Sequence, residues 1–239
     1  MPRGKAKPSS TETAAEREDE EIPEWKRQSV ERSLTAARAR AQQRSDRFVA
    51  TTIELMGEKG SLDFTVQDVV DRSHMSIRTF YNYFASKDDL LAAVYQTIVS
   101  REVTPRLRTA CERQTDPVLR IRAYIEELYE LTSTPSPVAY SLTTFHNRLA
   151  EIRPSDLDHA FRPQVDLIIE LVRDAMAAKR LRSPLEPEKV ARLLHHTVLA
   201  IVHTRVLGAD PKAAVTAEEL WLFCAHGIGV QGESGEKKR

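Results

Sequence analysis

The stretch from Thr65 to Leu91 constrains the fold of this chain most, because it reads as two short helices joined by a tight turn. The hydroxyl of Thr65 can accept a hydrogen bond from the backbone N–H of Asp68, which predicts a helix over residues 66–72. One apolar face of this helix is formed by residues three and four apart, Val66, Val69 and Val70.

Ser76 can cap a second helix, predicted over residues 77–84. Its apolar positions, Phe80 and Phe84, are four residues apart and are expected to enter a core. The other faces carry Arg78, Thr79, Tyr81, Asn82 and Tyr83. A short bracing helix, a turn and a second helix with such side chains are what a helix-turn-helix needs to contact the major groove of DNA.

This stretch resembles the DNA-binding signature of the TetR family of transcriptional regulators. The matching residues are Thr65, Ser73-His74-Met75-Ser76, Thr79-Phe80-Tyr81-Asn82-Tyr83-Phe84, Lys87 and Leu90-Leu91, with Phe48, Leu55-Met56, Glu58-Lys59-Gly60 and Phe64-Thr65 upstream. One departure is His74, which stands where the family usually has a turn glycine; histidine is among the residues that tolerate a positive φ. The resemblance covers roughly residues 47–95, and beyond them it rests on helical pattern and length.

We expect Arg78 to read a base, because a guanidinium can donate two parallel hydrogen bonds to guanine. Thr79 and Asn82 can contact base edges or phosphates, and Ile77 offers apolar contact. Phosphate contacts are expected from helix N-termini and the cationic first helix, at Thr65, Ser76 and Arg47. The resemblance adds Tyr81, Tyr83 and Lys87 as phosphate-binding positions. For Tyr81 the alternative is a side chain that belongs partly to the core. For Lys87 the alternative is a solvated side chain without a DNA contact, and the same two readings apply to Arg38 and Arg40 of the first helix.

The pattern along the rest of the chain is helical, so the predicted fold is all-α. Residues 38–95 are predicted to form the DNA-binding domain and residues 96–231 a helical effector-binding and dimerisation domain, joined by a helix that starts after Ser86 and kinks or restarts near Pro105. Residues 1–30 and 232–239 are predicted to be disordered tails. Within the first tail, Arg3, Lys5 and Lys7 suggest either a DNA-contacting arm or a solubilising segment.

Composition limits the function without naming it. The chain has 35 Lys and Arg against 35 Asp and Glu, so an electropositive face must be local. No apolar run predicts a membrane span or a signal peptide, and the two distant cysteines, Cys111 and Cys224, do not suggest a disulfide framework. We therefore expect a cytoplasmic protein that needs no cofactor.

The resemblance implies a small-molecule effector cavity and a dimer interface in the second domain. Candidate cavity residues are Tyr124, Tyr129, Tyr140, Phe145, His146, Asn147 and Phe161, although each is also an ordinary core candidate. Candidate interface residues on the last two helices are Leu194, Val198, Ile201, Val202, Leu220, Trp221 and Cys224.

Enzyme and metal functions have little support. His196 and His203 share a helix face, but no metal-binding motif accompanies them, and Cys224 with His226 lacks a legible orienting group. The sequence therefore predicts a homodimeric regulator, a repressor that an effector releases from a near-palindromic double-stranded DNA operator. The alternative is a protein of this fold that acts through small-molecule or protein binding without specific DNA recognition.

Overall fold

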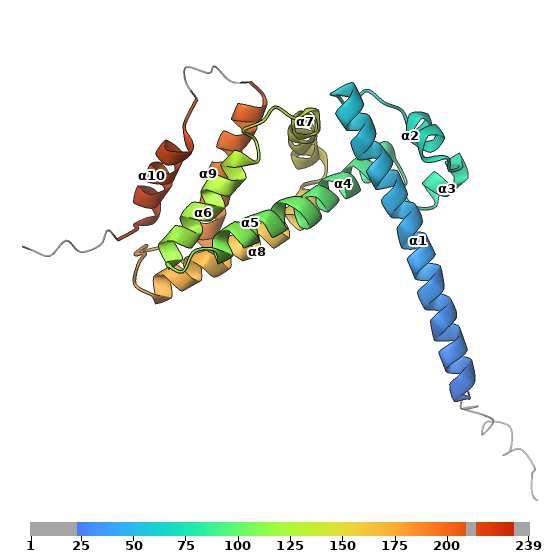
Figure 1. Ribbon diagram of the computed structural model, residues 1–239, viewed down its shortest axis with the longest axis horizontal. Helices are drawn as coiled ribbons and strands as arrows, with labels where there is room; N and C mark the ends of the chain where they lie inside the picture. Colours follow the sequence, from blue (N-terminus) through green and yellow to red (C-terminus); the bar gives the residue numbers. More distant parts are fainter. Residues whose placement is uncertain (1–22, 209–213, 232–239) are drawn as a thin grey trace, which may run out of the picture. The chain divides into compact units, whose positions relative to one another are not determined.

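The computed structural model describes residues 23–208 and 214–231, and these form an all-helical fold (Figure 1). Apart from an isolated bridge between Leu181 and Val230, the described residues lie in helices or connecting segments. The helices are α1 (Glu24–Lys59), α2 (Val66–Ser73), α3 (Ile77–Tyr81), α4 (Lys87–Ile98), the π-helix η1 (Val99–Val103), α5 (Thr104–Glu112), α6 (Pro117–Glu130), α7 (Pro137–Ile152), α8 (Pro154–Ala177), α9 (Pro187–Val206) and α10 (Ala217–Ile228). None of the described helices combines the length and apolar character that crossing a membrane needs.

The chain forms two compact units that divide inside α1, one ending at Arg44 and the other beginning at Ser45. In the first unit the described residues, 23–44, are exposed apart from the half-buried Ala41. Helix α1 begins at Glu24, within the segment 1–30 for which the sequence predicted disorder. The predicted arm residues Arg3, Lys5 and Lys7 and the tail 232–239 lie outside the described residues.

The second half of α1 packs with α2, α3 and α4 around aromatic side chains, and we call residues 45–95 the head. The ring centroids of Phe48 and Phe80 lie 5.5 Å apart, and those of Phe80 and Phe84 lie 5.6 Å apart. All three rings are buried, as the spacing of four between Phe80 and Phe84 predicted. Helix α3 is shorter than predicted: it ends at Tyr81, and Asn82 and Tyr83 form the turn that brings Phe84 back to the core.

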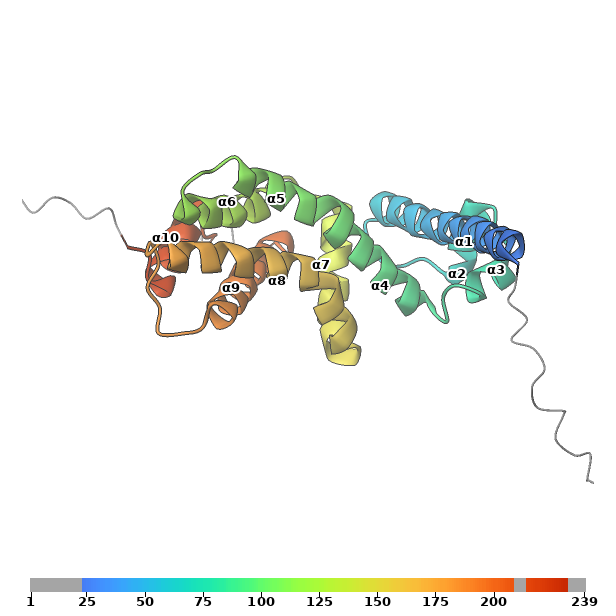
Figure 2. The same cartoon turned by 90° about the horizontal axis from the view of Figure 1, so that it is seen from below.

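Helix α4 passes through η1 into α5, so the three elements form one connection between the head and the helices beyond it (Figure 2). Proline at residue 105 has no N–H to donate to the preceding turn, and its ring clashes with the carbonyl there. The backbone before Pro105 adopts the wider π-turn of η1. At its end the Thr104 hydroxyl donates a hydrogen bond to the Val99 carbonyl at 2.7 Å. The predicted kink near Pro105 is therefore a π-helix immediately before it.

Helix α8 is the central element of the remaining helices. It contacts α4, η1, α5, α6, α7 and α9, while α10 packs on α6 and α9. Gly229 follows α10 with a φ of 75°, a conformation that favours glycine. Its backbone lies so close to Arg182 that a Cβ would be 2.0 Å from the Arg182 carbonyl oxygen, which leaves no room for a side chain.

Candidate nucleic-acid interface and ligand cavity

Two side-chain caps and one left-handed residue fix the helix-turn-helix. The Thr65 hydroxyl accepts from the Asp68 N–H at 3.1 Å, and the Asp68 carboxylate accepts from the Thr65 N–H at 2.8 Å. The Ser76 hydroxyl accepts from the Thr79 N–H at 3.0 Å. His74 ends α2 with φ 53° and ψ 41°, so histidine adopts the conformation expected of the missing glycine. The predicted caps and turn are confirmed.

The exposed surface of α3 carries most of the residues predicted to contact DNA. Ile77 and Tyr81 are 42% and 57% exposed, although both are apolar or aromatic, whereas Phe80 between them is fully buried. Arg78 is exposed, and among the described residues its guanidinium has no hydrogen-bond or ion-pair partner. The helix therefore presents a free cation and large side chains outward. Among the other residues predicted to contact DNA, four are exposed, Arg47, Thr65, Ser76 and Asn82, and two are half-buried, Thr79 and Tyr83.

Lys87 points inward, unlike the other predicted phosphate ligands. Its ammonium donates to the backbone carbonyl of Leu62 and to that of Phe64 at 2.6 Å, and it lies 4.3 Å from the centroid of the Phe64 ring. Burial lowers the pKa of the Lys87 ammonium from its ordinary value. In this geometry Lys87 holds the loop before α2 against the start of α4, and two of the three N–H donors of its ammonium are already engaged.

The charge of the head is distributed unevenly. Acidic residues outnumber basic ones between residues 45 and 95, but several acids are neutralised: Glu58 by Arg72, Asp68 by Lys59, Asp88 by Arg148 and Asp89 by Arg153. In the segment 24–44 of α1 the basic residues outnumber the acidic ones. The cations expected to contact DNA are thus Arg78 on α3 and the arginines of α1.

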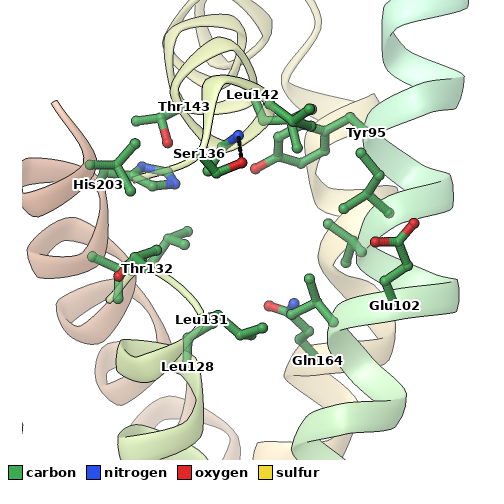
Figure 3. A pocket seen from close by; sticks show the side chains of 18 of the residues that line it. Tyr95, Glu102, Leu128, Leu131, Thr132, Ser136, Leu142, Thr143, Gln164 and His203 are labelled. Atoms are coloured by element: carbon green, nitrogen blue, oxygen red, sulfur yellow. Dashed lines mark hydrogen bonds between the residues drawn. The ribbon is translucent and has the colours of Figure 1, made fainter. Parts of the chain in front are cut away.

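A cavity of about 400 Å³ lies among α4, η1, α6, α7, α8 and α9 (Figure 3). Most of its lining is aliphatic, from residues such as Ile98, Val99, Leu128, Leu142 and Val202. Its polar lining residues are Tyr95, Glu102, Thr132, Ser136, Thr143, Gln164 and His203. The head also lines it through Ile53 of α1. An apolar enclosure of this size with a few polar groups is typical of a small-molecule site.

Phe161 is the one predicted effector residue that lines this cavity among the residues described. Tyr124 is fully buried, and its hydroxyl is 3.0 Å from Nδ1 of His195. The Tyr129 hydroxyl donates to the Val215 carbonyl at 2.7 Å. Phe145 is a buried core residue, while Tyr140 and Asn147 are exposed. These residues occupy the expected helices but the wrong faces, because the sequence does not show which stripe of a two-sided helix faces a void.

Histidines line both this cavity and a second one of about 730 Å³. His203 lines the first cavity, and His146, His195 and His196 line the second. The rings of His146 and His203 lie 4.4 Å apart, and Nδ1 of His146 is 2.9 Å from the Tyr95 hydroxyl. Burial lowers the pKa of His146 and of His203 to about 4 and that of His195 to about 3. All three are therefore neutral at pH 7, and no group of three potential metal ligands occurs in the described part of the chain.

The sequence missed Tyr95, Glu102 and Gln164 as cavity residues. One signal was available for Gln164: it is a lone amide on the stripe of α8 that otherwise carries Phe161, Val165 and Ile168. Polar groups on a buried stripe need partners, so such a residue is either satisfied in the core or aimed at a ligand.

The predicted interface residues lie mostly in the core of the chain itself. Leu194, Val198, Val202, Leu220, Trp221 and Cys224 are each at most 7% exposed, and Ile201 is half-buried. Their burial leaves little surface for a partner. The apolar side chains that α9 and α10 leave exposed are Leu193, Leu222 and Phe223, at 59%, 46% and 68%.

The fold and these two sites define the class: an all-helical protein with a helix-turn-helix head and a ligand-sized cavity beyond it. The profile of the family described as bacterial regulatory proteins, tetR family, matches residues 48–94. The match to this family therefore covers the helix-turn-helix head, and it confirms the resemblance to TetR-family transcriptional regulators seen in the sequence.

The relatives agree with this assignment. The chain is 27% identical over 99 residues to the HTH-type transcriptional regulator BetI of Brucella melitensis, a match that covers 41% of this chain and 50% of BetI. The chain thus spans about half the length of the curated relatives it matches. A TetR-family regulator of Pectobacterium atrosepticum has the same fold, with a TM-score of 0.66 and 18% identity over 82% of this chain and 99% of that one. Thermus thermophilus FadR in complex with lauroyl-CoA has a TM-score of 0.61 and 22% identity over 80% of this chain and 98% of that one.

Proposed function

We propose that this protein is a sequence-specific repressor that binds a near-palindromic operator as a homodimer and is released by a small molecule. The observation that carries the proposal is the shared segment η1. It forms a wall of the cavity through Val99, Glu102 and Val103, and it continues α4, which packs in the head through Leu90, Leu91 and Val94. A ligand in the cavity would therefore touch the element that positions the head.

The head supports DNA recognition through α3. Arg78 is exposed and unpaired among the described residues, and a bidentate guanidinium–guanine contact contributes about 1–3 kcal/mol of discrimination. The two helix caps hold Thr65 and Ser76 at helix N-termini, which favour phosphate oxygens. The left-handed His74 preserves the turn, so this departure from the family pattern does not favour the alternative of a protein without specific DNA recognition.

The exposed apolar face of α9 and α10 supports dimerisation. Leu193 and Phe223 are large apolar side chains that both line a cavity of about 150 Å³ between these helices, and both are more than half exposed. Isologous packing of such a face on a second copy would remove it from water. Two copies joined there would present two α3 helices to successive half-sites.

Release requires that the effector prefer the conformation with low operator affinity, because equal affinity for both states shifts nothing. A π-turn is a local widening of the helix and is frequent at functional sites. We infer that a ligand between η1 and α8 changes the direction in which α4 leaves the bundle. Thermus thermophilus FadR, solved with lauroyl-CoA, is an example of this fold with a bound small molecule.

The test is fluorescence anisotropy with the double-stranded DNA that flanks the gene of this protein. We expect Arg78→Ala to reduce the preference for operator over scrambled DNA by roughly tenfold to a hundredfold. Arg113→Ala is the matched control, since Arg113 is an exposed arginine at the end of α5. Unchanged selectivity of Arg78→Ala would remove the base-reading role.

Phe223→Glu tests the dimer. We expect it to yield monomers by light scattering at micromolar concentration and to weaken operator binding while far-UV circular dichroism is retained. A fully dimeric Phe223→Glu protein would place the interface elsewhere.

A further inference from the structure

One cavity residue has a hydrogen-bonding atom without a partner. Gln164 of α8 is 2% exposed, and its Oε1 atom is buried with no hydrogen-bond partner among the described residues. In Figure 3 its side chain points from α8 into the cavity, between Leu131 and Glu102. A buried amide oxygen without a donor lowers the stability of the fold, and a ligand that supplies an N–H or O–H removes that defect.

The charges around the cavity argue against an anion. None of the lining residues that the structure describes is Lys or Arg, whereas Glu102 lines it and has no ion-pair partner among them. Arg205, next to the lining residue Val206, is held elsewhere: its guanidinium lies 4.0 Å from the Tyr129 ring centroid and donates to the Tyr129 carbonyl at 3.3 Å. An anion placed here would lose its hydration and find no cation.

The remaining polar lining is uncharged. Burial lowers the pKa of His203 to about 4, so its imidazole is neutral at pH 7. Thr132, Ser136 and Thr143 add hydroxyl groups, and the Ser136 hydroxyl already accepts from the Ala139 N–H at 3.3 Å. Hydroxyl, imidazole and amide groups recognise neutral polar atoms through hydrogen bonds.

We propose that the cavity binds an uncharged, mainly apolar molecule that carries a hydroxyl or N–H donor, that Gln164 Oε1 accepts from this donor, and that carboxylates and phosphates are excluded. This proposal rests on the proposed function, because it assigns the ligand class of the same cavity. The volume of about 400 Å³ falls in the range of small-molecule sites. The class differs from that of an acyl-CoA, which carries phosphates, so the ligand bound in the FadR structure of Thermus thermophilus does not transfer to this chain.

The experiment compares probes that differ in one group, by equilibrium dialysis against the full chain. The first series is 2-naphthol, naphthalene and 2-naphthoate, and the second is 1-decanol, decane and decanoate. We expect the neutral donor of at least one series to bind roughly tenfold more tightly than its parent hydrocarbon, and its carboxylate to bind more weakly than both. A carboxylate that binds as tightly as its alcohol, or failure of both alcohols to bind, overturns the proposal.

Gln164→Leu tests the acceptor without creating a cavity, because leucine and glutamine are similar in volume. We expect this variant to abolish the preference for 2-naphthol over naphthalene and to raise the melting temperature, since it removes an unsatisfied buried amide. Gln96→Leu, at an exposed amide of α4 outside the cavity, is the matched control and is expected to retain the preference. A lower melting temperature of Gln164→Leu, with the preference retained, would make Gln164 a structural residue and overturn the assignment.

Glu102→Gln tests the exclusion of anions. We expect it to raise the affinity for 2-naphthoate about severalfold and to leave 2-naphthol binding unchanged. An unchanged affinity for the anion would overturn the role of this carboxylate. Operator binding is measured separately by anisotropy, so a protein that binds 2-naphthol but no DNA would contradict the proposed function and leave this inference standing.

Discussion

The head and the helices beyond it fill their interiors differently. In the head, Phe48, Phe80 and Phe84 pack ring against ring, and the buried Ser73 hydroxyl donates to the Val70 carbonyl at 3.1 Å. The three buried side-chain atoms without a hydrogen-bond partner among the described residues all lie beyond the head, at Ser141, Gln164 and His195. The cavity of about 400 Å³ also lies mainly among those helices.

The difference in packing matches two different functional requirements, DNA reading by the head and ligand binding by the helices beyond it. A surface that reads DNA must hold its side chains in one geometry, and a close-packed aromatic core with satisfied caps does so. A domain that admits a ligand needs empty volume and polar groups that the protein itself does not satisfy, and it accepts a lower stability there.

The largest effect is expected from opening the core of the head. Phe80→Ala removes a ring with 0% exposure that contacts three other rings, and we expect it to lower the free energy of unfolding by about 3–5 kcal/mol. Urea unfolding followed by far-UV circular dichroism measures this loss. The matched control is Leu142→Ala on the half-buried cavity wall, which should cost less than half as much because the space around it is already partly empty. Equal costs would contradict the contrast in packing.

A smaller effect is expected from acid. His195 is buried neutral with a pKa near 3, so between its ordinary pKa of about 6.5 and that value the unfolded chain binds the proton and the folded chain does not. The contribution is therefore absent above about pH 6.5, and stability falls as the pH drops below it, by roughly 2 kcal/mol at pH 5 for this one group.

His195→Gln should reduce this loss, as measured by urea unfolding at pH 7 and pH 5, whereas His159→Gln, an exposed histidine of α8, should keep it. If His195→Gln lost the same stability between the two pH values as the unaltered protein, the acid sensitivity would come from other groups, with His146 and His203 the next to replace.

The smallest effect compares two buried serines, each 1% exposed. Ser73→Ala in the head removes a hydrogen bond and should cost about 1 kcal/mol. Ser141→Ala beyond the head removes an unsatisfied hydroxyl and should stabilise the protein by up to about 1 kcal/mol. The same urea experiment distinguishes them, and a loss of stability in both variants would show that Ser141 has a partner in solution.

Local rules made much of the head predictable. The caps at Thr65 and Ser76, the start of a helix after Ser86 and the positive φ of His74 depend on residues within a few positions of one another, and all of them are confirmed. The failure within the head is the end of α3, which stops at Tyr81 because Phe84 must turn back to meet Phe48. That contact joins residues far apart in the sequence. The domain boundary near residue 95 stays a prediction.

The cavity and the interface were less predictable for the same reason. Periodicity identified α8, α9 and α10 but not which apolar stripe each one turns toward its own core. Leu194 and Trp221 were predicted to face a partner and are buried, while Leu193 and Phe223 beside them are exposed. Tyr124 was predicted to line the cavity and is instead fully buried against His195.

The sequence by itself determined that the chain is helical, that it carries a TetR-like head and where the caps and the turn of that head lie, because these depend on short-range hydrogen bonding and on spacing along one helix. Only the tertiary structure decided that Lys87 turns inward to two carbonyls, that Pro105 is accommodated by a π-turn, and that Gln164 faces a void without a partner. Each of these depends on which helices meet, since a side chain's partner is set by the neighbouring element and not by its own sequence.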